Sequence, residues 1–265
     1  KSALDGDKLG YTDAFGIPAL RAAIARHYDA WYGVTVPTER IVVTTGSSGA
    51  FVLSFLAAFN PGDRVAIVAP GYPCYNNILG AFGVEVVMLE GTAESRFQPT
   101  PAMLDAALAD YGTLDGLIVA SPSNPTGTVL APAEFAAIAD WCEAHRVRFV
   151  SDEIYHGITY AGPAPTAAAL DANAIVINSF SKYFSMTGWR LGWMIVPPDL
   201  VRAVECLAQN LFISPPTLSQ HAAVAAFDCH EECEANLEVY RRNRAVLLEG
   251  LPTVGFDRLA PADGA

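Results

Sequence analysis

The chain has 265 residues, 52% of them hydrophobic, and a formal net charge of −12 at pH 7. This length and apolar content predict a globular protein with one large buried core, or one large domain and a fragment of a second. The 16 Lys and Arg residues form no basic run, which argues against nucleic acid as a partner.

The sequence also lacks the usual features of membrane and metal-binding proteins. Its longest apolar stretch, Ala50 to Phe59, is well short of the roughly 18 residues that a membrane span needs, and we see no signal peptide. The cysteines have no disulfide-framework spacing, and Cys229 and Cys233 make no complete metal ligand set. We therefore expect a cytoplasmic protein with reduced thiols, no membrane partner and no metal site.

In chain order, the first predicted element is a helix that opens at Pro18, a residue suited to a first helical turn. Its Leu20, Ile24, Tyr28 and Trp31 fall on one stripe. Beyond it, short β-branched runs alternate with longer amphipathic segments. The predicted strands are 41–45, 64–68, 84–89, 116–120, 148–151, 174–178 and 191–196, and the predicted helices are 48–59, 72–82, 101–111 and 131–145.

Several of these strands are continuously apolar, as buried parallel strands tend to be. The alternation predicts a three-layer α/β/α domain in which helices cover both faces of a mostly parallel, seven-stranded sheet. A loop rather than a helix joins the last two strands. After the sheet, residues 216 to about 249 predict one long helix that Gly250-Leu251-Pro252 should break.

Three polar clusters lie at predicted strand ends, where ligands bind in open α/β sheets. The first is Thr45-Gly46-Ser47-Ser48-Gly49-Ala50, which leaves a strand and enters a helix. Free backbone N–H groups and two hydroxyls at such a helix start suit a phosphate. Taken alone, a turn of this kind more commonly only caps the helix.

The other two clusters follow the fourth and fifth strands. In Ser121-Pro122-Ser123-Asn124-Pro125-Thr126-Gly127 two prolines fix the backbone around Asn124, so this is either a rigid turn or a way to aim the amide at a ligand oxygen; either X-Pro bond could be cis. In Asp152-Glu153-Ile154-Tyr155-His156 an acidic residue ends a buried strand. The first histidine of an H-E-x-x-H zinc motif is missing, which argues against zinc.

Ser179-Phe180-Ser181-Lys182, followed by Gly188-Trp189-Arg190, carries the most specific chemistry. A lysine that condenses with an aldehyde must be neutral part of the time, and a partly desolvated turn beside a second cation favours that state. A solvated loop lysine is the simpler interpretation. S-x-x-K also occurs in penicillin-binding enzymes, but no S-D-N or K-T-G accompanies it here.

Six segments, taken together, carry a family resemblance. In order they are 46–50, 70–73, 124–127, 152–155, 179–182 and 188–192. With them the chain, from about Tyr11 to its C-terminus, resembles the class I/II pyridoxal-phosphate-dependent aminotransferases of fold type I. The resemblance implies a pyridoxal 5'-phosphate cofactor.

The resemblance also implies residue roles. Lys182 would form the Schiff base and shuttle the proton, and Asp152 would pair with the pyridinium nitrogen so that the ring can accept an electron pair. Asn124 and Tyr155 would bond the phenolic oxygen, and Tyr72 would stack on the ring. The implied phosphate site comprises Gly46, Ser47, Ser48, Ser179 and Arg190. Tyr11 would reach the phosphate of the neighbouring subunit, which implies a homodimer.

The function implied is transfer of an amino group between an L-amino acid and a 2-oxo acid, with a neutral or aromatic amino acid as the expected substrate. A C–S β-lyase or another α-carbanion enzyme shares the same motifs. An alternative of another class is the effector domain of a MocR-type transcriptional regulator, which would need a basic winged-helix domain upstream.

The resemblance divides the chain into three parts. Residues 1–35 would form an N-terminal segment and helix on the large domain and the dimer interface, 36–215 the cofactor-binding large domain, and 216–265 a connecting helix and the start of a small domain. Family members extend beyond both ends and carry the arginine that binds the substrate carboxylate in the small domain. We therefore expect this chain to be truncated and to turn over poorly.

Overall fold

Seven strands form one sheet in the order β1-β7-β6-β5-β4-β2-β3 in the computed structural model, which describes residues 2–6 and 9–265. The pairs β2–β3, β2–β4, β4–β5 and β5–β6 are parallel, whereas β7 is antiparallel to both neighbours. The predicted mostly parallel, seven-stranded sheet is confirmed. The strands are β1 (Ile41–Thr44), β2 (Arg64–Ala69), β3 (Glu85–Glu90), β4 (Gly116–Ala120), β5 (Arg148–Asp152), β6 (Ile175–Ser179) and β7 (Gly192–Ile195).

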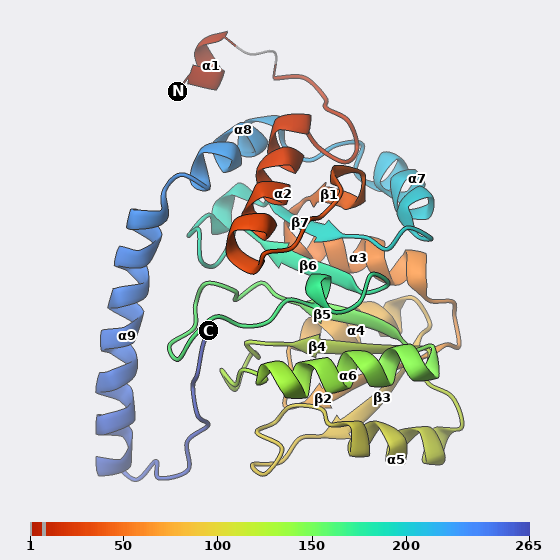
Figure 1. Ribbon diagram of the computed structural model, residues 1–265, viewed down its shortest axis with the longest axis vertical. Helices are drawn as coiled ribbons and strands as arrows, with labels where there is room; N and C mark the ends of the chain where they lie inside the picture. The colour runs from red at the N-terminus through yellow and green to blue at the C-terminus, as the bar shows by residue number, and fades with distance from the viewer. Residues whose placement is uncertain (1, 7–8) are drawn as a thin grey trace.

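Helices cover both faces of the sheet, and each face has its own apolar core (Figure 1). On one face lie α2 (Pro18–Tyr32), α5 (Pro101–Tyr111), α6 (Pro132–His145) and α8 (Thr217–Ala226). On the other lie α3 (Gly46–Ala58), α4 (Pro73–Ala81) and α7 (Val201–Leu211). Successive strand residues alternate between the cores, as Val42 and Val43 do, because side chains alternate across a pleated strand.

The smaller elements include α1 (Ser2–Gly6) and three short 3₁₀ helices at Thr38–Arg40, Ala167–Ala169 and Thr187–Trp189. The sequence patterns did not predict α1, α7 or these turns. Three of the four residues in the predicted stripe on α2 are buried, but Trp31 is 38% exposed. None of the helices in the described ranges is both long and apolar enough to cross a membrane. All five cysteines are free thiols.

The prediction of one helix from 216 to about 249 is wrong. The chain forms α8 and then α9 (His230–Thr253), with a bend at 227–229. Phe227 turns inward at this bend and packs against Phe180 and Phe184, with ring centroids 5.4 Å and 5.2 Å apart. The predicted break at Gly250-Leu251-Pro252 is also wrong, because α9 continues to Thr253. Proline removes its own helical donor and crowds the carbonyl four residues earlier, but Pro252 stands in the last turn, where little helix remains to be disrupted.

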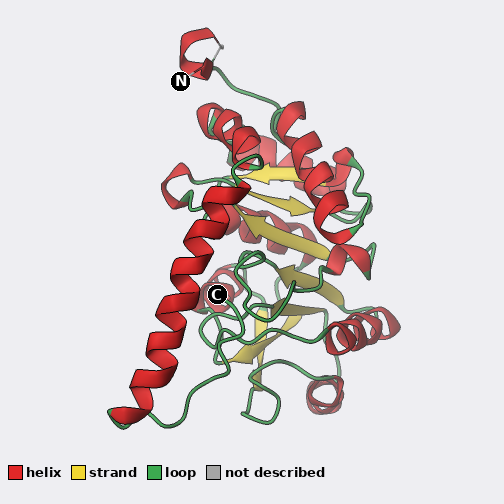
Figure 2. Cartoon of the chain, turned by 60° about the vertical axis from the view of Figure 1, so that its left-hand side comes forward, coloured by secondary structure: helices red, strands yellow, loops and turns green. Residues whose placement is uncertain are grey.

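Helix α9 runs along one side of the molecule, beside the ends of the central strands rather than on a sheet face (Figures 1 and 2). After α9 the chain returns toward the sheet, where Gly264 forms an antiparallel bridge with Thr159. The Ala265 N–H donates to the Ile158 carbonyl at 3.0 Å. This contact places the described C-terminal residues against the loop that follows β5.

The topology brings the polar clusters to one edge of the sheet. Strands β2, β4, β5 and β6 are mutually parallel, so the residues that follow them emerge at the same edge. Because β1 and β6 are both antiparallel to β7, β1 ends there too, and β7 begins there with Gly192 paired to Thr44 and Ser179. The glycine–serine turn, the Asn124 loop, Asp152 and the lysine loop therefore meet.

Candidate active site

A cavity of about 180 Å³ opens at this edge of the sheet. Eight residues that we singled out from the sequence line it: Ser47, Ser48, Tyr72, Asn124, Asp152, Tyr155, Lys182 and Arg190. Five other lining residues were missed: Tyr75, Ala120, Ile154, Ser181 and Thr187. The cavity thus joins residues from six separate segments of the chain.

One end of the cavity is the N-terminus of α3 beside a guanidinium group. The first N–H groups of a helix have no partner within it, and Thr45 caps none of them with its side chain. Arg190 lies against Gly46, where a Cβ would be 2.7 Å from Arg190 Nη2. Gly192 packs directly against the same turn, because a Cβ at this position would be only 3.0 Å from the Ser47 nitrogen. N–H groups, hydroxyls and a guanidinium make this end an anion site.

The other end holds the carboxylate of Asp152, which is 3% exposed at the end of β5. The Tyr75 hydroxyl donates to Oδ2, and the Ile154 N–H donates to Oδ1 at 3.1 Å. Burial raises the pKa of Asp152 to about 6, against the lowering effects of these two donors and of the Lys182 charge. Among the described residues no cation lies within salt-bridge distance of this carboxylate, so it suits a cationic ligand atom.

Lys182 is half-buried, with Nζ 5.0 Å from the centre of the Tyr155 ring. The amine therefore lies over a ring face, where a cation is attracted. Phe180, fully buried, holds the start of the lysine loop by packing on Trp193 at 4.9 Å. Hydrogen bonds from Phe180 N to the Leu191 carbonyl and from Met186 N to the Phe180 carbonyl close the loop.

The Asn124 loop and the tyrosines form the remaining walls. The loop is closed by a hydrogen bond from Gly127 N to the Ser123 carbonyl at 2.8 Å, and the peptide bonds before Pro122 and Pro125 are both cis. Tyr72 lies at the surface, 36% exposed, with its ring edge-on to Tyr75 at 5.6 Å. Burial is also the main cause that raises the Tyr72 pKa.

Three residues singled out from the sequence lie outside the cavity lining. Gly46 stands behind it against Arg190. Ser179 is buried with its hydroxyl 2.9 Å from Ser181 Oγ, and it is Ser181 that faces the cavity. Tyr11 is 84% exposed near the start of the chain. The signal for Tyr75 is its position three residues after Tyr72 at the start of α4, which puts both rings on one side.

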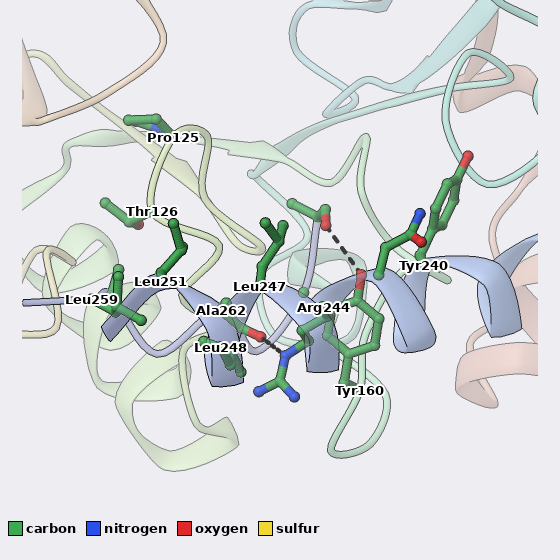
Figure 3. A pocket seen from close by; sticks show the side chains of 14 residues that line it. Pro125, Thr126, Tyr160, Tyr240, Arg244, Leu247, Leu248, Leu251, Leu259 and Ala262 are labelled. Carbon is green, nitrogen blue, oxygen red and sulfur yellow. Dashed lines mark hydrogen bonds between the residues drawn. The ribbon is translucent and has the colours of Figure 1, made fainter. Parts of the chain in front are cut away.

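A second cavity, of about 400 Å³, lies between α9 and the Asn124 loop (Figure 3). Leu247, Leu248, Leu251 and Leu259 line much of it. Arg244 is held at its edge because Nε donates to the Ala262 carbonyl at 2.6 Å. Its described lining holds no Asp, Glu, Lys or His side chain, whereas Asp152 and Lys182 both line the first cavity.

The model of the family "Aminotransferase class I and II" matches residues 2–264. The chain belongs to this family. Aminotransferases of class I and II use pyridoxal phosphate and move an amino group between an amino acid and a 2-oxo acid. The resemblance, the cofactor and the enzyme class predicted from the six segments are therefore confirmed.

Curated relatives include the valine–pyruvate aminotransferase of Mycobacterium tuberculosis (strain ATCC 25618 / H37Rv), which is 55% identical over the whole chain. The chain covers 68% of that protein. The (5-formylfuran-3-yl)methyl phosphate transaminase of Methanocaldococcus jannaschii is 36% identical over 97% of the chain, which covers 67% of it. The chain thus spans about two thirds of the length of these aminotransferases.

Solved structures agree. An aminotransferase from Mycobacterium tuberculosis superposes with a TM-score of 0.95 at 55% identity, over 100% of this chain and 68% of that one. The aspartate aminotransferase of Thermus thermophilus with maleate gives 0.92 at 33% identity, over 100% of this chain and 70% of that one. The fold is that of these aminotransferases.

Pyridoxal phosphate fits the cavity of this aminotransferase on two observations. The anion site at α3 and Arg190 suits its phosphate, and the absence of a side chain at Gly46 lets the Arg190 guanidinium lie against the start of α3. The buried Asp152 carboxylate, without a cation beside it among the described residues, suits the protonated ring nitrogen. Both groups and the lysine amine line one cavity.

The pKa of Asp152 predicts a pH-dependent stability of the cofactor-free protein. Because that pKa is about 6 when folded and ordinarily 3.8, the folded state keeps a proton that the unfolded chain releases over this range. Asp152 alone should therefore lower the unfolding free energy by roughly 3 kcal/mol as pH rises from about 4 to 6. Burial lowers the pKa of His27 and His156, and these groups act in the opposite direction, so the contribution of Asp152 is measured as the difference between the wild type and Asp152→Asn. In Asp152→Asn this contribution should vanish.

Thermal or denaturant unfolding from pH 4 to 8 measures how the unfolding free energy changes with pH. Glu153, whose pKa burial raises to about 8, should leave a second decline in the variant that extends to higher pH. Asp140→Asn, on an exposed position of α6, is the matched control and should keep the wild-type slope. Equal slopes below pH 6 in the wild type and Asp152→Asn would contradict the assignment.

Proposed function

We propose that Lys182 is the amine that would hold the cofactor aldehyde and that, once the substrate amine has displaced it, would carry the proton during amino-group transfer. The observation that supports this most is the meeting of Lys182, the buried Asp152 and the anion site in one cavity. We also infer that residues 36–215 act as the cofactor-binding large domain and that 216–265 lead toward a small domain.

Pyridoxal phosphate, when bound, supplies an electron-accepting ring for the pair left at the substrate α-carbon. Asp152 keeps the ring nitrogen protonated, since a buried carboxylate favours a cation beside it. Asn124 and Tyr155 hydrogen-bond the phenolic oxygen, and Tyr72 covers one ring face. Ser47, Ser48 and Arg190 hold the phosphate, and Ser179 acts on it through Ser181.

Borohydride labelling tests the role of Lys182. The purified protein with pyridoxal phosphate should give a visible band that borohydride fixes onto the Lys182 peptide, and Lys182→Ala should lose the band. Turnover of the variant should fall by more than about 1,000-fold because the proton carrier is gone. Asp152→Ala should lose turnover far more than cofactor affinity. A wild-type label on any other lysine would overturn the assignment.

The donor proposed here is a neutral, aliphatic amino acid such as valine, with pyruvate as an acceptor. The 55% identity to a valine–pyruvate aminotransferase supports this choice. The lining of the first cavity and of a third one, about 400 Å³ in volume and bordered by Lys182 and Tyr155, also supports it, because Arg190 at the phosphate end is the one arginine among the described residues of these two cavities. A second carboxylate on the donor would be left without a cation.

Steady-state assays with pyruvate test the donor. The kcat/KM for valine should exceed that for aspartate by roughly 100-fold. The side-chain carboxylate of aspartate would lose its water on binding without gaining a cationic partner. The reverse order would contradict the proposal. Release of ammonia without any 2-oxo acid would instead favour the C–S β-lyase alternative.

A homodimer in which Tyr11 reaches the neighbouring phosphate site is proposed as the assembly. Tyr11 is 84% exposed in the single chain, so its side chain is accessible to a partner subunit. Tyr11→Phe should weaken pyridoxal phosphate binding about tenfold through loss of one charge-assisted hydrogen bond. Mixing it with Lys182→Ala protein should restore wild-type affinity at one of the two sites of each mixed dimer. No restoration would mean that Tyr11 acts within its own subunit.

A further inference from the structure

Tyr183, the residue after Lys182, joins the lysine loop to α9. Its side chain is 4% exposed, and its hydroxyl lies 2.8 Å from His230 Nδ1 and 2.9 Å from Glu234 Oε1. Both partners stand one turn apart on α9, about 50 positions later in the chain. The residue that directly follows the reactive lysine is therefore fixed to a different element.

The direction of these hydrogen bonds is determined by charge. Burial, and then the bond to Glu234, raise the pKa of Tyr183 well above its ordinary value, so the hydroxyl keeps its proton. The Tyr183 hydroxyl has one proton, and it donates this proton in a hydrogen bond to the Glu234 carboxylate. The phenol oxygen then accepts from His230, which requires the proton of that imidazole on Nδ1.

The ring of Tyr183 is held as firmly as its hydroxyl. It lies on Gly157, where a Cβ would be 2.5 Å from the ring carbon Cδ2. Trp31 meets it edge-on from α2 at 5.2 Å. Gly157 is two residues after Tyr155, over whose ring the Lys182 amine lies. A shift of Tyr183 would therefore move both the lysine and the tyrosine beneath it.

A second contact ties the same loop to α9. The Asn236 amide donates to Ser185 Oγ at 3.3 Å, and Ser185 N in turn donates to the Lys182 carbonyl at 2.9 Å. Tyr240, one turn further along α9, lines a cavity of about 400 Å³ together with Lys182 and Tyr155. Figure 3 shows Tyr240 and Arg244 on this stretch of α9. The helix thus forms a wall of the space next to the lysine.

We propose that Tyr183, with Glu234 and His230, is a positioning clamp that sets the direction of the Lys182 amine by holding its loop against α9. The proposal rests on the proposed role of Lys182. The loop from 180 to 191 contains one 3₁₀ turn, and its backbone hydrogen bonds are isolated turn contacts, so side-chain contacts to α9 add the anchors that regular structure would otherwise supply. Displacing an acid–base group by about an ångström is enough to cost a large factor in rate.

Tyr183→Phe tests the clamp because it keeps the ring and removes the hydroxyl. In the holoenzyme kcat should fall about tenfold while KM for the amino donor changes less than about twofold. The visible circular dichroism of the bound cofactor should also change, and amide hydrogen exchange of 181–186 should speed up in the cofactor-free protein. Tyr111→Phe, at an exposed position on α5, is the matched control. It should leave the kinetic constants, the circular dichroism and the hydrogen exchange unchanged.

Glu234→Ala removes one of the two hydrogen bonds of the Tyr183 hydroxyl and leaves the one from His230. It should lower kcat by no more than Tyr183→Phe does, and the double variant should be no worse than Tyr183→Phe, because Glu234 acts through that hydroxyl. Additive losses, or wild-type exchange of 181–186 in Tyr183→Phe, would overturn the clamp. The exchange measurement needs no cofactor, so a failure of the Lys182 labelling would be recognised separately.

Discussion

The desolvation of one carboxylate is the constraint on which the site depends. Asp152 ends the central strand β5 and is almost completely removed from water. Isolated burial of a charge is costly unless partners compensate it, and here Tyr75 and the Ile154 N–H do so only in part. In the proposed function, pairing with a cationic ring nitrogen would offset the remaining cost. Cofactor binding and sheet geometry would then be coupled at a single residue.

The neighbouring carboxylate shows how the environment separates two similar groups. Glu153, the next residue, is fully buried. Its carboxyl group accepts hydrogen bonds from Ser151 Oγ, Thr166 Oγ1 and the Ala167 N–H at 2.8–3.0 Å. Its pKa rises to about 8, chiefly through burial, so it is largely protonated at neutral pH. His156, 3.5 Å away, has its pKa lowered to about 3 by burial and stays neutral. Asp152 is left to supply the charge in the cavity.

Much of this arrangement could be predicted from the sequence, because it depends on local signals. Buried parallel strands are continuously apolar, and their ends are marked by glycine, proline and hydroxyl residues. Those ends carry eight of the cavity residues. The direction of a side chain is harder to predict from the sequence. Ser179 and Ser181 look equivalent there, yet Ser179 faces the Leu191 carbonyl and Ser181 faces the cavity. The bend before α9 was missed because Phe227 is drawn into a core assembled from distant residues.

The same distinction explains why the contacts of Tyr183 escape sequence reasoning. Its ring meets residues from α2, from the turn after β5 and from α9, which share no spacing in the chain. The lysine loop, described from 180 to 191, has no helical or strand hydrogen bonds beyond one 3₁₀ turn, so long-range packing of this kind adds to its rigidity. In this fold the candidate site residues are therefore placed by strand ends, and the helices around them add contacts that hold the loops.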